Sequence, residues 1–343
     1  MAELANGVAS PPVQALLAPP VSWPPTLVVV IDTEEEFDWT APFDPASTAV
    51  SNIDLQPLAQ AVFDAHGVVP TYVVDYPVAS TPQAAAVLRA IAADGRCDIG
   101  AHLHPWVTPP AEGPVDTRHS YPGNLPAALE RHKLTVLTDT IAASFGARPT
   151  VYKAGRYGIG AATPATLRAL GYAVDVSVVP HTDFSADGGP DFRGAPEGPY
   201  RIADGLCELP LSVHFVGRLA SQGPWLFHRL SAHPARRLRL PGVLSRLGLL
   251  TRLRLSPEGG SLTEMTRQTR AALAAGTRLF MLTYHSSSLL PGATQYVRTE
   301  ADRRHFLATL DGYLHVFLAE LGGRADTVTR VAAALMAGQA PGR

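Results

Sequence analysis

The sequence has few of the residues that build disulfide scaffolds, zinc knuckles or membrane spans. Its 343 residues include two cysteines, Cys97 and Cys207, which form no CxxC pair, so neither a disulfide framework nor a zinc knuckle is indicated. No apolar run approaches the ~18 residues that a membrane helix needs. The N-terminus carries acidic Glu3 and no basic cluster, which argues against a secretory signal and makes a cytoplasmic location the expectation.

An excess of positive charge is also missing. The formal net charge is −2, with 46% hydrophobic and 17% charged residues, which is the profile of an ordinary globular protein. Bulk charge therefore gives no reason to expect a nucleic-acid partner. Lys133 and Lys153 are the only lysines, and the other basic residues are arginines or histidines.

The glycine pattern of a dinucleotide site is absent as well. Asp32, Thr33, Glu34 and Glu35 follow the first predicted strand, where a Rossmann fingerprint would place glycines. Glycines do occur near a later strand end, at 155, 158 and 160, but their spacing does not match that fingerprint. The sequence therefore argues against a dinucleotide cofactor.

Strand-like and helix-like segments alternate along most of the chain. Strands are predicted at residues 26–31, 68–74, 97–102, 150–154, 173–179 and 278–284. Helices are predicted at residues 55–66, 83–94, 125–145, 163–170, 261–275, 302–321 and 326–336. This alternation favours an α/β fold with about seven parallel strands and helices outside, either as an open doubly wound sheet or as a closed barrel.

Polar side chains gather where the predicted strands end. Side chains two apart on a strand share a face, so Asp32 and Glu34 project together, as do His102 and His104. Two imidazoles and a carboxylate form a ligand set for zinc or a similar ion with a position open for water. The alternatives are that residues 34–36 form a solvated acidic loop and that the histidines are structural. His285 follows the last predicted strand in the same way.

Four ordered phrases resemble the polysaccharide deacetylase family, whose domain is also called the NodB homology domain. The phrases are IDTEEEFDW, GAHLHPW, AGRYG and YHSSSLLPG, and they look most like the WalW-like branch, whose members are linked with cell-surface polysaccharide synthesis. The resemblance covers roughly residues 26–321. It implies a distorted (β/α) barrel of about seven parallel strands and a metal-dependent hydrolase that removes N-acetyl groups from a sugar or polysaccharide precursor.

The resemblance also implies a role for each matching residue. The ion, expected to be zinc with cobalt or manganese as alternatives, would be held by Glu34, His102 and His104. Asp32 would be the general base, Arg156 would orient it, and His285 would be the general acid. A backbone N–H near Tyr157 would hold the oxyanion, and Asp175 would tune the acid.

The phrases depart from the usual family pattern at several positions. Thr33 separates the two carboxylates of the first motif, so Glu35 or Glu36 are alternatives to Glu34 as the metal ligand. The usual histidines are four apart, and Trp106 stands at the place of the second, which is why His104 is assigned as its substitute. Lys153 competes with Arg156 for the role of orienting Asp32.

Aromatic residues flank these motifs. Trp39, Trp106 and Tyr157 suit the faces of sugar rings, and Trp106 and Tyr157 are the predicted substrate-binding residues; the alternative for Trp106 is that it packs on the barrel rim.

A stretch rich in arginine and free of Asp and Glu runs from residue 215 to 257. Leucines alternate with its arginines, which predicts a solvated helical insertion at the barrel mouth or, alternatively, a peripheral contact with an anionic membrane or glycan. We expect a Pro/Ala-rich N-terminal tail (1–25), one barrel domain (26–337) that includes the insertion (215–258), and a C-terminal tail (338–343). Two other functions stay open: hydrolysis of a small amide or cyclic ureide, and non-catalytic carbohydrate binding.

Overall fold

A mostly parallel sheet of ten strands forms the centre of the computed structural model, which describes residues 10–38, 41–113, 115–231 and 240–338. Its parallel ladder runs, in spatial order, through β11 (Leu279–His285), β2 (Thr26–Thr33), β3 (Thr71–Val74), β4 (Asp98–Leu103), β5 (Val151–Ala154), β6 (Val174–Asp175) and β8 (Leu206–Glu208). Three short strands complete it: β12 (Arg324–Ala325) beside β2, β7 (Tyr200–Ala203) antiparallel to β8, and β1 (Ala15–Leu16) antiparallel to β7.

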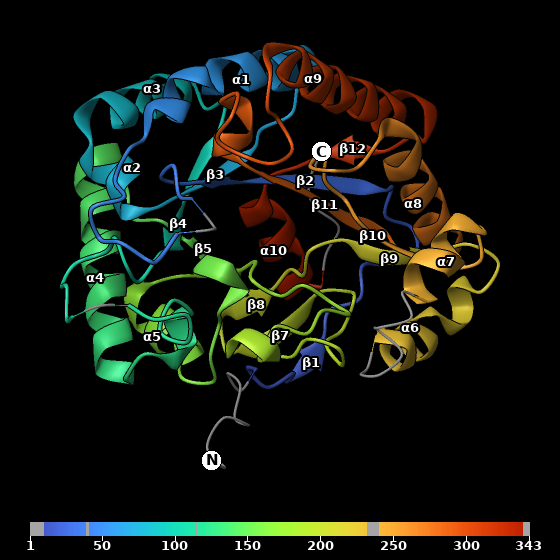
Figure 1. The fold of residues 1–343 in the computed structure, drawn as a ribbon, viewed down its shortest axis with the longest axis horizontal. Coiled ribbons are helices and arrows are strands. Elements are labelled where there is room, and N and C mark those ends of the chain that lie inside the picture. Colours follow the sequence, from blue (N-terminus) through green and yellow to red (C-terminus); the bar gives the residue numbers. More distant parts are fainter. Residues whose placement is uncertain (1–9, 39–40, 114, 232–239, 339–343) are drawn as a thin grey trace.

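Helices surround this sheet, as Figure 1 shows. They are α1 (Gln56–Ala65), α2 (Tyr76–Ser80), α3 (Pro82–Ala93), α4 (Ala127–Phe145), α5 (Thr163–Leu170), α8 (Leu262–Ala274) and α9 (Glu300–His315), which continues as a π-helical turn at Val316–Glu320. The last helix, α10 (Val328–Met336), lies inside the ring of elements and contacts β2 and β6 through an apolar face that includes Val331 and Leu335. The predicted distorted (β/α) barrel is confirmed.

The central strand β2 shows why the sequence folds in this way. Its residues, TLVVVIDT, are all buried, because helices and neighbouring parallel strands cover both faces. The polar residues at its end, Asp32 and Thr33, are thereby carried into the interior at the carboxyl edge of the sheet. In a barrel of this kind, that edge is where the chemistry of the fold is concentrated.

The barrel wall has a seam between β8 and β11, which is where the barrel is distorted. Ser212 and Leu255 bridge it by single hydrogen bonds: Ser212 Oγ accepts from the Met281 N–H (2.8 Å), the Leu255 N–H donates to Ser212 O (2.9 Å), and the Thr283 N–H donates to Leu255 O (3.2 Å). A separate antiparallel hairpin, β9 (Val213–Val216) with β10 (Thr251–Arg254), leads out of this seam.

The arginine-rich insertion starts and ends in that hairpin. Between β9 and β10 it contains α6 (Gly223–Ser231) and α7 (Leu240–Arg246), and Figure 1 shows both helices at one side of the molecule. Arg236, Arg237 and Arg239 lie outside the described residues. No helix in the described part of the chain is long and apolar enough to span a membrane.

The N-terminal segment differs from the expected tail in part. Residues 15–16 form β1 on the edge of the sheet, and the Trp23 side chain is buried in the core. Residues 1–9 and 339–343 lie outside the described residues.

Candidate active site

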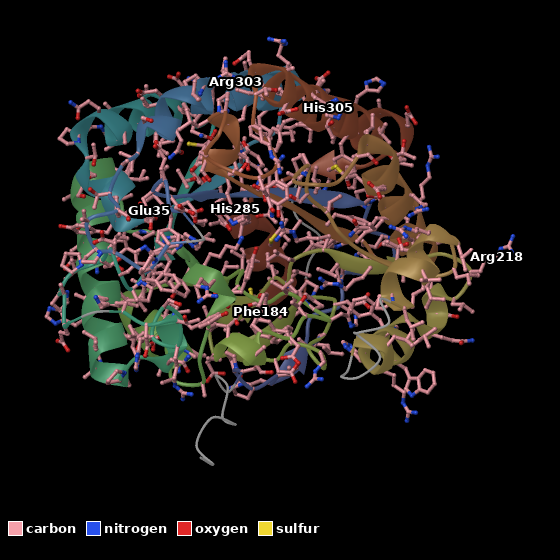
Figure 2. All side chains as sticks on the ribbon, in the orientation of Figure 1. Glu35, Phe184, Arg218, His285, Arg303 and His305 are labelled. Atoms are coloured by element: carbon pink, nitrogen blue, oxygen red, sulfur yellow. The ribbon has the colours of Figure 1, made fainter. Side chains whose placement is uncertain are left out.

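A cavity of about 1230 Å³ opens at the carboxyl ends of the strands. Figure 2 shows His285 near the centre of the molecule, with Glu35 to its left and Phe184 below it in the view. The predicted residues that line the cavity are Asp32, Glu34, His102, His104, Arg156, Tyr157 and His285. Strands β2, β4 and β11 therefore bring residues far apart in sequence to one place.

Glu34, His102 and His104 face one another at the base of the cavity. Glu34 Oε2 lies 3.4 Å from Nε2 of His102 and 3.4 Å from Nε2 of His104. All three side chains are buried, and one ligand atom from each lies within 4.8 Å of the others. These three residues could hold a metal ion.

The hydrogen bond at Nδ1 of each imidazole determines which ring nitrogen remains available to a metal ion. His102 Nδ1 lies 3.0 Å from the carbonyl oxygen of Lys153, and because a carbonyl only accepts, the ring carries its proton there and its lone pair on Nε2. His104 Nδ1 lies 2.8 Å from Glu35 Oε2, and His104 Nε2 is buried without a hydrogen-bond partner among the described residues. Two imidazole lone pairs and a carboxylate directed at one point fit a divalent cation.

The two neighbouring glutamates make other contacts, although Glu36 also lines the cavity. Glu35 accepts hydrogen bonds from His104 and from Trp106 Nε1 (2.7 Å), and burial raises the pKa of Glu35 to about 7. Glu35 and Asp75 also group with His104, but on the side where the ring nitrogen already has a partner. Glu36 accepts from the Ser51 hydroxyl (2.7 Å). Of the three glutamates, Glu34 is the one positioned as a ligand.

Asp32 is held by Lys153. Lys153 Nζ donates to both carboxylate oxygens, at 2.6 and 2.8 Å, and lies 3.2 Å from Thr283 Oγ1. Burial would raise the pKa of Asp32, but the charges of Lys153, His102 and His285 and the Lys153 hydrogen bonds together outweigh burial and lower this pKa to about 2. Asp32 is therefore an ionised carboxylate within the cavity at neutral pH.

Arg156 does not orient Asp32, so that prediction is wrong. Arg156 has a left-handed backbone (φ 52°), and its guanidinium lies over the Tyr121 ring, donates to Ser120 Oγ (2.5 Å) and sits 3.8 Å from Asp187. The turn after β5 directs Arg156 to the rim of the cavity, whereas Lys153, inside β5, points into the barrel. Lys153, the competing candidate, occupies the position beside Asp32.

His285 is paired with a residue that the sequence analysis missed. Its Nδ1 lies 3.0 Å from Glu258 Oε2, its backbone N–H donates to Glu258 Oε1, and its Nε2 lies 3.5 Å from Asp32 Oδ2. Burial lowers the pKa of His285, but the Glu258 charge raises it, and the net result is a pKa well above the ordinary value. His285 is thus an imidazolium whose Nε2 faces the cavity.

Asp175, predicted to tune His285, is elsewhere. It accepts a hydrogen bond from Ser177 Oγ (2.6 Å) and neighbours Glu208 on the adjacent strand, and burial raises its pKa. The predicted role is not supported, because the Asp175 carboxylate on β6 contacts Ser177 and Glu208 and is not among the groups that shift the pKa of His285.

The two predicted substrate-binding aromatics differ in placement. Trp106 is 2% exposed, stacks on the His104 ring (4.2 Å) and packs against Phe37, so it supports the His104 side chain and does not line the cavity. Tyr157 does line the cavity, and its hydroxyl accepts a hydrogen bond from Arg254 (2.8 Å). Trp39 lies outside the described residues.

Further supporting residues were not predicted. The Glu34 N–H donates to Ser286 Oγ (3.1 Å), and Asn52 Nδ2 donates to Glu34 O (3.1 Å), so the backbone of this residue is fixed on both sides. Gly155 lacks a side chain because a Cβ there would clash with the His104 ring and with Leu103 O. The sequence signals were slight: Ser286 follows His285 directly, and Glu258 is the first acid after the acid-free stretch.

Known structures resemble this architecture. A putative polysaccharide deacetylase from Mycobacterium smegmatis matches with a TM-score of 0.58 and 18% identity, over 97% of this chain and 98% of that one. A probable polysaccharide deacetylase from Pseudomonas aeruginosa PAO1 matches with a TM-score of 0.51 and 12% identity, over 93% and 92% of the chains. The chain has the polysaccharide deacetylase fold. The structure of Puue allantoinase also shares this deacetylase fold, with a TM-score of 0.51 and 14% identity over 95% and 96% of the chains.

Comparisons at the level of sequence found no match. No protein-family profile matches the sequence, and no curated protein is similar to it. The WalW-like branch therefore stays a prediction within the polysaccharide deacetylase fold.

Proposed function

We propose that the protein is a metal-dependent hydrolase that removes an N-acetyl group from a sugar. The observation that carries this proposal is one cavity that holds a metal-ligand set, an ionised carboxylate and a charged imidazole side by side. A protein that only binds carbohydrate has no need of an acid and a base 3.5 Å apart. The non-catalytic alternative is therefore the weaker one.

Glu34, His102 and His104 would hold the ion, for which zinc is the first expectation because two imidazoles and a carboxylate suit it. When bound, a divalent ion would supply Lewis-acid activation of a water and of the acyl carbonyl. Glu35 and the Lys153 carbonyl keep both rings in the tautomer that leaves Nε2 free.

The remaining steps belong to side chains of this chain. Asp32 takes a proton from the attacking water, while Lys153 holds both of its oxygens and keeps it ionised. His285 gives its Nε2 proton to the departing nitrogen, and Glu258 keeps that ring charged and oriented. The water oxygen ends on the acyl carbon and the proton on nitrogen, so the products are acetate and a free amine.

Aromatic and polar side chains line the walls of the cavity. Tyr157, Phe184 and Tyr296 offer ring faces to a sugar, and carboxylates and arginines lie between them. The open mouth and the volume of about 1230 Å³ accommodate a substrate larger than a single small amide.

The test is metal content together with acetate release. We expect about one divalent ion per chain in the wild-type protein, and its loss in folded Glu34→Ala and His102→Ala/His104→Ala variants. The His285→Ala variant is the matched control: it should keep the ion and lose acetate release from N-acetylated sugars by about 10²–10⁴-fold. A wild-type protein that retains no ion after incubation with zinc, cobalt or manganese would overturn the proposal.

Hydrolysis of a small amide or cyclic ureide is a second candidate, favoured by the fold shared with an allantoinase. The same constellation of Asp32, His285 and the three ligands suits attack on either kind of C–N bond. Turnover of allantoin-like ureides by a metal-loaded protein that leaves acetylated sugars untouched would decide for this candidate.

A further inference from the structure

The insertion between β9 and β10 exposes apolar side chains that the core does not use. Trp225 on α6 is 59% exposed, and Val243 and Leu247 are 45% and 66% exposed. The Leu247 N–H donates to Val243 O one helical turn away, so these two side chains lie on the same face of the α7 segment. Helices α6 and α7 pack against each other, which places these apolar groups on one small unit.

The same unit is strongly basic. No Asp or Glu stands between Glu208 and Glu258, a stretch that holds eight arginines. Arg218, Arg229 and Arg246 are exposed and form no salt bridge with a carboxylate in the described parts of the chain. Figure 2 shows Arg218 at the outer edge of the molecule, directed away from its body.

Apolar and basic groups are interleaved within this surface. The Arg229 guanidinium lies 4.8 Å over the exposed Trp225 ring, on the same face of α6. An indole with a guanidinium beside it suits the interface of a bilayer, where the ring enters the acyl boundary and the charge meets a lipid phosphate. A solvated insertion would require the leucines to pack inward, whereas Leu247 is exposed.

We propose that this surface, formed by Arg218, Trp225, Arg229, Val243, Arg246 and Leu247, docks the protein on an anionic lipid bilayer. Arginine near such a bilayer gains from its negative surface potential, and the exposed Trp, Val and Leu gain from partial burial in it. The proposal does not depend on the reaction that the cavity performs, because none of these six residues lines it.

Other partners fit this surface less well. A second copy of the chain would place arginines against arginines, without a carboxylate in the insertion to neutralise them. A soluble acidic polymer would pair with the arginines but would leave Val243 and Leu247 in water. A bilayer with anionic headgroups satisfies both kinds of group.

The experiment is sedimentation of the full-length, metal-loaded protein with vesicles of phosphatidylcholine containing phosphatidylglycerol, and with vesicles of phosphatidylcholine alone. We expect binding to the anionic vesicles at low salt and at least tenfold weaker binding at high salt or to the neutral vesicles. Arg229→Gln/Arg246→Gln and Trp225→Ser/Leu247→Ser should each weaken binding by about tenfold or more. Circular dichroism and metal content should stay at wild-type values.

The matched control is Leu58→Ser/Arg267→Gln, which removes one exposed leucine from α1 and one exposed arginine from α8, both outside the proposed docking surface, and should bind vesicles like the wild type. Absence of wild-type binding to anionic vesicles at low salt would overturn the proposal. So would equal loss in the control and insertion variants, binding only to a soluble polyanion such as heparin, or self-association in place of vesicle binding. Each of these outcomes leaves the acetate assay unaffected, so the two proposals fail separately.

Discussion

At the scale of single residues, Lys153 connects the two halves of the candidate site. Its Nζ holds both oxygens of Asp32, while its carbonyl oxygen accepts the Nδ1 proton of His102. The buried charges of Lys153 and Asp32 compensate each other, and removal of one partner of such a pair typically costs about 3–5 kcal/mol. One strand residue therefore positions Asp32, the proposed general base, by its side chain and His102, a proposed metal ligand, by its backbone.

The first prediction concerns this lysine. Lys153→Met should lower kcat by about 10²–10³-fold and lower the melting temperature, because Asp32 loses its hydrogen bonds and its compensating charge. Metal content should stay the same, since the carbonyl that orients His102 remains. Lys153→Arg should recover part of kcat. The comparison variant is Arg156→Met, which does not touch Asp32; a larger loss of kcat in this variant than in Lys153→Met would contradict the assignment.

A second prediction concerns Glu258. The Glu258 carboxylate raises the pKa of His285, so Glu258→Gln should lower that pKa and reduce the imidazolium fraction at a given pH. The alkaline limb of the profile of kcat against pH should then move to lower pH, and kcat at pH 8 should fall by about tenfold or more. The measurement is a pH–rate series at saturating substrate. An unmoved alkaline limb would show that His285 does not act as the acid.

The grouping of Glu34, His102 and His104 was predictable from the sequence, but the residues that hold their side chains in place were not. His102 and His104 alternate along a strand, so their common direction follows from the two-residue period. Arg156 was misassigned because it is itself the first of two left-handed residues in the turn after β5, and the direction of a side chain in such a turn does not follow from sequence spacing. Glu258 was missed because its contact with His285 spans 27 residues across the seam.

At the scale of elements, a buried carboxyl group joins α4 to α5. Glu130 on α4 is 1% exposed and accepts a hydrogen bond from Thr163 Oγ1 at the start of α5 (2.5 Å). Burial raises the pKa of Glu130 from 4.5 to about 7. The folded protein therefore binds this proton more tightly than the unfolded chain does, and stability from this group is present below pH 4.5 and declines as pH rises toward 7.

The third prediction follows from this decline of stability as pH rises. Glu130→Gln keeps the oxygen that Thr163 uses and removes the charge, so it should raise the free energy of unfolding at pH 8 by up to about 3 kcal/mol, at about 1.4 kcal/mol per pKa unit. At pH 4.5 the variant and the wild type should differ little. The check is chemical denaturation at both pH values. A variant that is less stable than the wild type at pH 8 would contradict the inferred pKa.

Elements with strong periodicity were placed well, and short ones were not. The helix predicted at residues 163–170 coincides with α5, whose end is marked by Gly171 in the left-handed conformation. The hairpin of β7 and β8 went unnoticed although Asp204-Gly205, a favoured hairpin turn, stands between its strands. The strand predicted at residues 173–179 is regular only at Val174–Asp175, because its later residues bond singly to neighbouring segments.

At the scale of the whole molecule, strand–helix alternation was enough to predict a barrel, because each parallel strand needs a helical crossover. Alternation alone could not distinguish an open sheet from a closed barrel, because closure depends on whether the two edge strands of the sheet contact each other. Here the edges meet through Ser212 and Leu255, neither of which has a distinctive sequence signal.

The seam at Ser212 and Leu255 has a consequence for how this protein can change. Every strand of the parallel ladder is locked in register by its neighbours, so an added residue there would displace side chains of the cavity. The segment between β9 and β10 leaves and re-enters the wall through a paired hairpin, and its length alters no register of the parallel ladder. Related chains can therefore vary this segment, and with it the surface by which they attach to other structures, while the side chains of the cavity keep their positions.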